Sequence, residues 1–356
     1  MRRKLYLLSA IAILVCIASF IISLIFGIVL TMLYVLLISC VFAFFAANKL
    51  IKHTNWWKNQ YLATNQFVSN AGYRDNIIRN YDIVNLGSNP AHFAFFYQDV
   101  KGQSWATGSQ GQDMDFEILK YFHSYIKTGG TVIIPIMPFT SIAPYLKEHR
   151  EYWGLSYYSK FVKLLDSAQL QNLPINYKIL NYYIRYPLFF NRRAVRYLIK
   201  DCEPDTRYHI VEQPMMKLDL EQDAEKWIKG WTKEFKLKNL QDVFDESWNK
   251  YYDEAIELNK CIVDFCIERN IKPVFVCVPM TKYLSDKFPT HIWDRLVKDF
   301  VNACNVHNIP FLDYTNDSRF CDPSLYFNSF FLNMKGRKLF TKQVLKDLGF
   351  DNNTKQ

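Results

Sequence analysis

The chain has 356 residues, of which 50% are hydrophobic and 17% aromatic, so a sizeable buried core can form and wholesale disorder is excluded. The formal net charge is +9, but residues 1–58 alone hold six basic residues and no acidic one. The rest of the chain has 37 basic against 34 acidic residues, an excess of only three. Because nucleic-acid binding needs a clustered basic face on the folded domain, this distribution argues against nucleic acid as a partner.

An uncharged run of 43 residues, 5–47, follows the first basic residues. As one helix it would be about 65 Å long, about twice the hydrocarbon thickness of a bilayer. We therefore expect two transmembrane passes, for example 5–25 and 28–47, with Gly27 near the turn. One strongly tilted or partly interfacial helix is the alternative. The run is too long for a cleaved signal peptide.

Basic residues flank the run on both sides, and aromatic residues suited to an interfacial belt follow it at Trp56 and Trp57. The basic residues are Arg2, Arg3 and Lys4 before the run and Lys49, Lys52 and Lys58 after it. Positive charge at both ends favours a hairpin whose two ends lie in the cytoplasm. The soluble domain is then expected on the cytoplasmic side, whereas a single pass would place it outside.

Beyond this anchor (1–58), we expect a helical linker (59–80), one soluble domain (81–350) and a short tail (351–356). Short apolar runs typical of buried strands alternate with helical patterns in the soluble domain. The predicted strands are 81–86, 104–106, 131–137, 273–278 and 310–312. This rhythm predicts an α/β fold with about five mainly parallel strands, covered on both faces.

Two predicted helices follow the first strands, one starting at Pro90 and running past Tyr97, the other with Asp113 as its N-cap. Residues 140–245 then break the rhythm and are predicted as a helical insertion outside the sheet. Within it, residues 177–200 interleave aromatic residues with four arginines. The simplest interpretation is a solvated basic face. The alternative is a surface for an acidic glycan, a lipid headgroup or a partner protein, and the sequence does not separate these.

Eight cysteines are present, without a CxxC pair. Cys261 and Cys266 fall in a helical apolar pattern that predicts both as core residues. We therefore expect no metal site, and no motif in the chain indicates a cofactor.

Ser88 is the candidate nucleophile. It follows the first predicted strand directly, after Gly87 and before a helix start, so it is expected at the carboxyl edge of the sheet. Backbone N–H groups at such a turn can stabilise an oxyanion, which is the setting a nucleophilic serine needs. An ordinary turn in which Ser88 only caps a helix is the alternative.

Three stretches resemble conserved blocks of the SGNH/GDSL-hydrolase superfamily. Residues 85–89 (NLGSN) resemble the block that carries the catalytic serine, and Gly108 lies where that family keeps its oxyanion-hole glycine. Residues 327–336 (FNSFFLNMKG) resemble the final block, F-x-D-x-x-H-L-N-x-x-G. The overall plan is similar to membrane-linked SGNH-like proteins of bacterial envelope-polysaccharide systems. The resemblance implies a flavodoxin-like three-layer αβα fold at a bacterial inner membrane, with a glycan or an envelope-assembly protein as partner.

The departures from the family pattern concern the catalytic residues. Asn328 stands at the position of the catalytic Asp and Phe331 at that of the catalytic His, and residues 138–140 (PFT) replace the third block's asparagine. Phenylalanine cannot accept the serine proton. The leading interpretation is therefore a non-catalytic binding or scaffold protein of envelope-polysaccharide assembly. The alternative is an active serine esterase or O-acyltransferase with a substitute base, for which His92, four residues after Ser88, is the first candidate.

Overall fold

The computed structural model describes residues 2–26, 28–59, 68–69, 72–73, 79–149, 154–159, 161–162, 165, 167–171, 173, 175–203 and 219–350. The chain divides into two compact units. The anchor unit is Met1–Lys58 with Lys178–Pro204, and the α/β unit is Asn59–Tyr177 with Asp205–Gln356. The middle of the predicted insertion is thus grouped with the anchor, which the sequence did not indicate.

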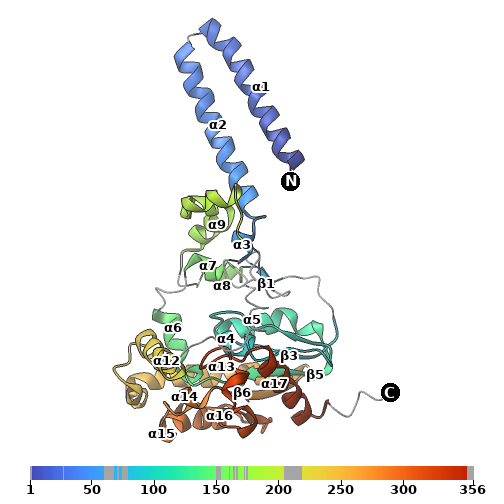
Figure 1. Cartoon of the computed structure of the whole chain (residues 1–356), viewed down its shortest axis with the longest axis vertical. Coiled ribbons are helices and arrows are strands. Elements are labelled where there is room, and N and C mark those ends of the chain that lie inside the picture. Colours follow the sequence, from blue (N-terminus) through green and yellow to red (C-terminus); the bar gives the residue numbers. More distant parts are fainter. Residues whose placement is uncertain are drawn as a thin grey trace. The chain divides into compact units, whose positions relative to one another are not determined.

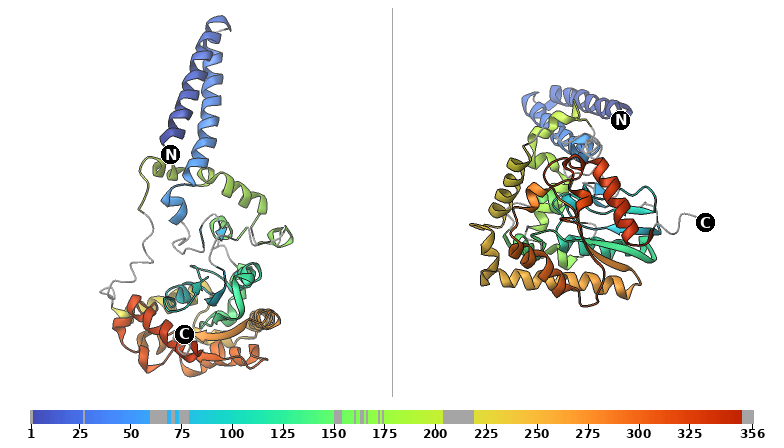
Figure 2. Two further views of the ribbon diagram at one scale, coloured as in Figure 1. Left: turned by 90° about the vertical axis from the view of Figure 1, so that its right-hand side faces the viewer. Right: turned by 60° about the horizontal axis from the view of Figure 1, so that its bottom comes forward.

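The anchor unit begins with two helices, α1 (Arg2–Phe26) and α2 (Ile28–Ile51), which lie side by side and antiparallel (Figures 1 and 2). In the described residues, one stretch, Met32–Ile51 of α2, is long and apolar enough to cross a membrane, with a mean hydropathy of 2.0. The apolar stretch in α1, Leu8–Phe20, is shorter. Gly27, predicted near the turn, lies outside the described residues.

Four short helices complete the anchor unit. They are α3 (Asn55–Asn59), α9 (Tyr177–Arg185), α10 (Pro187–Phe190) and the 3₁₀ helix η3 (Arg192–Leu198). Most of the predicted linker lies outside the described residues. Its described part includes two paired antiparallel strands, β1 (Val68–Ser69) and β2 (Gly72–Tyr73), where a helix was expected.

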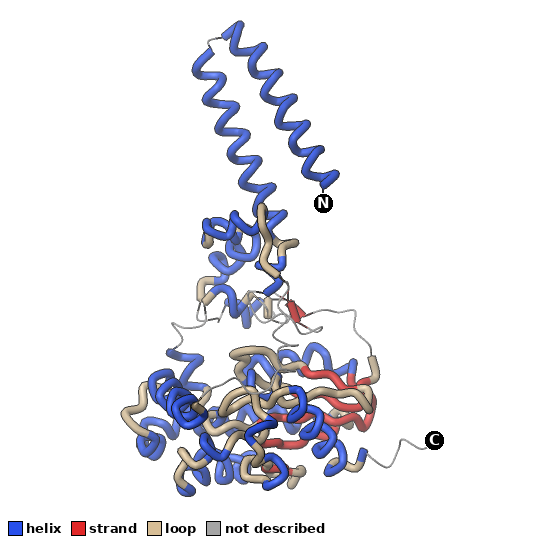
Figure 3. The backbone as a smooth tube through the Cα atoms, viewed as in Figure 1, coloured by secondary structure: helices blue, strands red, loops and turns tan. Residues whose placement is uncertain are grey.

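Five parallel strands form the sheet of the α/β unit, as predicted (Figure 3). They are β3 (Tyr81–Asn85), β4 (Gly102–Ser104), β5 (Ile126–Pro135), β6 (Lys272–Cys277) and β7 (Phe311–Asp313). Their order in the sheet is β4-β3-β5-β6-β7. Val84 on the inner strand β3 pairs in register with Gln103 on one side and Val132 on the other. Parallel pairing places the carboxyl ends of all five strands along one edge.

Helices follow the strands and fill the insertion. Those that alternate with the strands are α4 (Asn89–His92), α5 (Gln112–Phe122), η1 (His123–Tyr125), α13 (Asn249–Glu268), α14 (Lys282–Ser285), α15 (Thr290–Trp293), the π-helical turn η6 (Asp294–Lys298), α16 (Asp299–Cys304), η7 (Ser318–Phe320), η8 (Pro323–Leu325) and α17 (Met334–Asp347). Those of the insertion are η2 (Thr140–Ile142), α6 (Pro144–His149), α7 (Leu155–Tyr158), α8 (Ser167–Gln171), α12 (Leu220–Glu234) and η4 (Leu240–Phe244), followed by η5 (Glu246–Trp248).

Two helix predictions are wrong in detail. The helix after Pro90 ends at His92 instead of running past Tyr97. The N-cap of α5 is Gly111, with extended backbone, and Asp113 lies inside the first turn, where its charge favours the positive end of the helix dipole.

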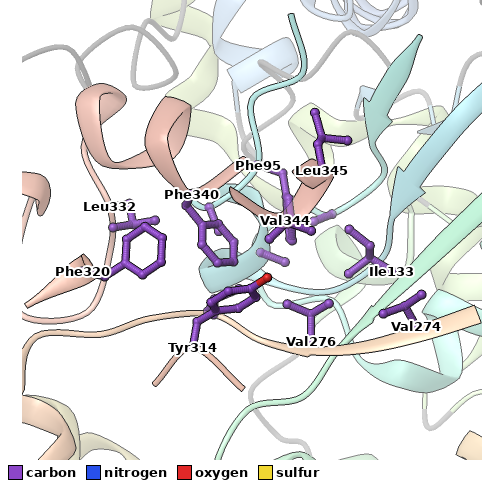
Figure 4. Close-up of a cluster of buried hydrophobic side chains, with 14 of the residues drawn as sticks. Phe95, Ile133, Val274, Val276, Tyr314, Phe320, Leu332, Phe340, Val344 and Leu345 are labelled. Carbon is purple, nitrogen blue, oxygen red and sulfur yellow. The ribbon is translucent and has the colours of Figure 1, made fainter. Parts of the chain in front are cut away.

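A large buried apolar cluster lies on one face of the sheet and includes residues of α4 and α17 (Figure 4). It joins the strand residues Ile83, Ile133, Val274 and Val276 to Phe95, Phe340, Val344 and Leu345. Side chains alternate along a strand, so Val84, Val132 and Phe275 point to the opposite face. These three are also fully buried, so both faces of the sheet are covered.

Candidate functional site

Ser88 lies at the carboxyl edge of the sheet, three residues after the end of β3. It is the N-cap residue of α4, with extended backbone (φ −101°, ψ −158°), and its half-buried side chain makes no capping hydrogen bond to that helix. The hydroxyl is therefore not used to hold the helix start. This placement is the one that the family resemblance implies for a nucleophile.

Gly87 fixes the turn that presents Ser88. Its φ of +109° lies in the region that disfavours side chains, and a Cβ there would lie 2.8 Å from Cγ of Pro135. Its carbonyl accepts a hydrogen bond from Thr107 N at 3.2 Å. This bond ties the loop after β3 to the loop after β4, and the buried Gly108 follows Thr107 directly. The structure thus brings the backbone turns of Ser88 and Gly108 together.

Asp115 is the residue of this edge that sequence reasoning missed. It is 4% exposed, and its Oδ1 accepts hydrogen bonds from Gly87 N at 2.8 Å and from Gln110 Nε2 at 2.5 Å. Burial raises the pKa of this carboxyl to about 7, against the two hydrogen bonds, which lower it. Because the Asp115 carboxyl holds the backbone N–H next to Ser88, the protonation of Asp115 is linked to the geometry of this turn. An acidic residue in the first turn of a helix has an ordinary explanation, so the sequence carried no signal for it.

His92 is buried at the end of α4, and its Nδ1 lies 3.0 Å from the carbonyl oxygen of Ala106. A carbonyl only accepts, so Nδ1 carries the proton and Nε2 is the acceptor of the neutral ring. The ring of Phe93 contacts that of His92 edge-on at 5.0 Å. The contact of Nδ1 with the Ala106 carbonyl is compatible with the tautomer that a general base requires.

Asn328 closes a local turn in the final block. Its Oδ1 accepts hydrogen bonds from Phe330 N at 2.8 Å and Phe331 N at 2.7 Å, and the side chain is 8% exposed. An amide oxygen that accepts two backbone N–H groups forms an Asx-type turn. These two contacts give Asn328 a structural role in holding the turn.

Phe331 lies in a cluster of aromatic rings beside α4. It stacks on Phe93 at 5.0 Å and on Phe330 at 5.1 Å, and Trp227 of α12 meets it edge-on at 5.2 Å. The ring has no atom that accepts a proton, so it cannot serve as a base. The position that resembles the family's catalytic histidine is therefore apolar and packed.

The rest of the final block connects α17 to α4. Asn333 is the N-cap of α17 and accepts a hydrogen bond from Gly336 N. A Cβ on Gly336 would lie 2.2 Å from the carbonyl oxygen of Leu325, so the close approach requires glycine. The next residue, Arg337, is fully buried and donates from Nη2 to the carbonyls of His92 and Phe95. The Leu-Asn-x-x-Gly pattern therefore has a packing explanation.

Two buried oxygens beside the predicted site have no hydrogen-bond partner among the described residues. They are Oδ1 of Asn89, next to Ser88, and Oγ1 of Thr107, next to Gly108. Buried polar atoms are nearly always satisfied in folded proteins, if not by the chain then by water or a ligand. The loops after β3 and β4 thus offer two unmet acceptors at the carboxyl edge.

The structure gathers no metal ligands where it describes the chain. No group of three or more His, Cys, Asp or Glu residues is placed to hold a metal ion in that part. Burial raises the pKa of Cys266 and Cys304 to about 12, which leaves both as inert thiols. Cys261 is exposed, which corrects the prediction that it is a core residue.

No protein-family model matches this chain, and no curated protein matches it in a search by sequence.

Proposed function

We propose that this chain is a membrane-anchored SGNH-like protein that has lost hydrolysis and binds a glycan or an envelope-assembly protein in polysaccharide assembly. The observation that carries the proposal is the packing of Phe331 against Phe93, Phe330 and Trp227. An apolar ring at the position of the base removes proton transfer, while Ser88, Asn89 and Thr107 still offer polar contacts. Loss of the base costs on the order of 10⁴-fold in rate, so binding is the activity that remains.

The strand order supports the fold-level part of this proposal. Numbered within the sheet from β3 to β7, the order β4-β3-β5-β6-β7 reads 2-1-3-4-5. This is the order of flavodoxin-like sheets, in which ligands bind outside the carboxyl ends of the strands near the point where the order reverses. Ser88 follows β3, which is a strand at that point, and we propose a three-layer αβα arrangement around it.

An active esterase or O-acyltransferase is the second candidate, and the contact of His92 Nδ1 with the Ala106 carbonyl oxygen at 3.0 Å is the observation that favours it. In this case His92 Nε2 would take the proton of Ser88, and the Gly108 N–H would stabilise the oxyanion. The acyl group would pass from the substrate oxygen to Ser88 Oγ, and then to water or to a sugar hydroxyl.

A serine-directed fluorophosphonate probe separates the two candidates. We expect no labelling of the purified full chain and no change of p-nitrophenyl acetate turnover in Ser88→Ala, because an unactivated hydroxyl does not attack the probe. Ser324→Ala, which removes a serine outside the site, is the matched control. Labelling that disappears in Ser88→Ala and persists in Ser324→Ala would establish the esterase, and its loss in His92→Gln would identify the base.

For the anchor we propose two passes through a bacterial inner membrane, with the α/β unit in the cytoplasm. The basic residues of 1–58 support this orientation, because positive charge is enriched on cytoplasmic flanks. So do residues 178–200, which belong to the anchor unit and hold six basic residues and no acidic one.

Cysteine labelling tests the orientation. Cys321 and Cys261 are exposed in the α/β unit, whereas Cys304 is buried and reports nothing. In intact cells, a membrane-impermeant maleimide should leave both exposed thiols unmodified until the membrane is permeabilised. The Cys321→Ser variant assigns the signal. Efficient labelling of Cys321 in intact cells places the domain outside and ends the two-pass proposal.

A further inference from the structure

Residues 178–203 are built onto the end of α2. We call residues 178–203, which hold most of α9 and all of α10 and η3, the platform. The side chain of Asn48, 1% exposed near the end of α2, accepts a hydrogen bond from Leu188 N at 2.9 Å. Leu188 also packs with Ile51 and Ala194 in a small buried core. The platform is therefore joined to the anchor helix by both a polar and an apolar contact.

A second set of contacts holds the platform to α3. Both carboxylate oxygens of Asp201 accept from the first two N–H groups of α3, those of Asn55 (2.6 Å) and Trp56 (3.1 Å). Trp56 stacks on Tyr197 of η3 with ring centroids 5.5 Å apart. The N-terminus of α3 thus binds the carboxylate of Asp201, so this negative charge makes its contacts within the anchor unit.

The platform exposes an unusual amount of apolar surface. Six of its large hydrophobic residues are exposed, as many as in all the described residues of the α/β unit, which is several times longer. They are Ile179, Tyr182, Phe189, Phe190, Val195 and Ile199. Ile199 is 92% exposed and Phe189 65%. So many exposed apolar side chains in one short segment indicate a contact with a partner or a membrane.

Basic side chains are interleaved with this apolar surface. Lys178, Arg185, Arg192, Arg193, Arg196 and Lys200 are all exposed. Arg196 is held over the Tyr197 ring at 4.8 Å, in line with the Trp56 stack. The pKa of Lys52, at the end of α2, is lowered by burial and by the charge of Arg185. The cluster thus carries a positive potential that an external anion would relieve.

The position along α2 fixes the depth of the platform. Tyr186 contacts the rings of Phe44 (6.1 Å) and Phe45 (5.5 Å). Phe45 precedes the end of α2 at Ile51 by six residues, which is about 9 Å along the helix. Segments that lie in a membrane interface bury their apolar side chains about 5–10 Å into the headgroup and acyl boundary. If α2 crosses the bilayer up to Ile51, Tyr186 contacts α2 at a depth that falls within this interfacial range.

We infer that the platform lies in the interface of the bilayer that α2 crosses and binds anionic lipid headgroups through its arginines and lysines. Phe189, Phe190 and Ile199 insert among the acyl chains, and Arg192, Arg193 and Lys200 contact the phosphates. The inference rests on α2 being a membrane span and not on the chemistry at Ser88. Anionic phospholipid is the occupant that both the charge and the depth select.

Lipid binding to the full chain, purified in a neutral detergent, tests the charge. Native mass spectrometry compares binding of dioctanoyl phosphatidylglycerol with that of dioctanoyl phosphatidylcholine. We expect the wild type to prefer phosphatidylglycerol and Arg192→Gln/Arg193→Gln/Lys200→Gln to bind it about a hundredfold more weakly, since each surface charge contributes about fivefold. Lys226→Gln/Lys229→Gln/Lys233→Gln, which removes three exposed lysines from α12, should keep the preference. Arg192→Lys/Arg193→Lys should also keep it.

Protection from trypsin in vesicles tests how deeply the platform lies in the bilayer. The platform of the full chain should resist cleavage in vesicles of equal parts phosphatidylglycerol and phosphatidylcholine. Phe189→Ser/Ile199→Ser should become susceptible, because these side chains no longer insert. Thermal midpoints equal to that of the wild type show that each variant is folded.

Several results would overturn the inference. They are equal binding of the two lipids by the wild type, a triple platform variant that keeps its preference, or a platform that trypsin cleaves in vesicles. Polygalacturonate that binds as tightly as phosphatidylglycerol and responds to the same variant would make the surface a glycan site instead. Resistance of the chain to alkaline carbonate extraction, measured in parallel, shows whether the anchor itself has failed.

Discussion

Replacing Arg337 by methionine is expected to lower the free energy of unfolding of the α/β unit by about 3 kcal/mol. Arg337 is fully buried, and Nη2 donates to the carbonyl oxygens of His92 (3.1 Å) and Phe95 (2.7 Å). The variant removes the donor and leaves both acceptors in place. Each buried carbonyl that loses its partner costs about 1–3 kcal/mol, and methionine refills much of the volume. A buried ion pair replaced as a whole can be neutral, but here the acceptors are backbone and remain.

Thermal unfolding of the full chain in detergent measures this effect. A loss of about 3 kcal/mol corresponds to a midpoint lower by about 6–12 °C for a unit of this size. Lys342→Met, on the exposed side of the same helix α17, is the control and should change stability by less than about 0.5 kcal/mol. Equal midpoints for Arg337→Met and the wild type would show that other groups satisfy the two carbonyls.

Replacing Asp115 by asparagine is expected to remove a pH dependence of stability. Burial raises the pKa of Asp115 to about 7 in the folded chain, well above the ordinary value of 3.8 for an aspartate side chain. Between these values the folded state binds a proton that the unfolded state does not. The free energy of unfolding therefore falls as pH rises from about 4 to about 7, and levels off above that. Over about three pH units the loss is on the order of 4 kcal/mol.

The variant is always neutral at this position, and its amide oxygen can still accept from Gly87 N and Gln110 Nε2. Its stability should match that of the wild type at or below about pH 4, exceed it by a growing amount as the pH rises, and exceed it most near pH 8. Thermal midpoints across this range, with Asp113→Asn as a control in the same turn, measure the difference. Parallel pH profiles for wild type and Asp115→Asn would contradict the prediction.

The architecture was predictable where the sequence repeats a local pattern. Short apolar runs between helical patterns predicted all five strands of the parallel sheet, with boundaries within two residues except the start of β5, which was predicted at 131 and lies at Ile126. For β4 the prediction was 104–106 and the structure has Gly102–Ser104. Ser88 at the carboxyl edge followed from the same pattern, because the residue after a parallel strand lies at that edge. Its chemistry stays a prediction.

Contacts between distant segments were not predictable from one sequence. Arg337 lies 245 residues from His92, and an arginine on an amphipathic helix is normally a surface residue. Asp115 lies 28 residues from Gly87, in a helical turn where an acid is common. Residues 177–200 look like part of a soluble insertion, because nothing in their composition indicates that they contact α2. In each case the role of the residue depends on a partner far away in the sequence, and the neighbouring residues give no sign of that partner.

The bond between Asn48 and Leu188 has a consequence for biosynthesis. Its two ends are 140 residues apart, and translation proceeds at about 5–20 residues per second. The amide of Asn48 therefore emerges about 7–30 s before the segment that pairs with it. For that interval α2 must be inserted and held while the side-chain oxygen of Asn48 lacks its partner, although the side-chain nitrogen still donates to the Phe44 carbonyl within the helix. The nascent chain thus passes through a stage in which the anchor depends on the insertion machinery. If the ribosome stops before residue 188, the anchor remains in that stage.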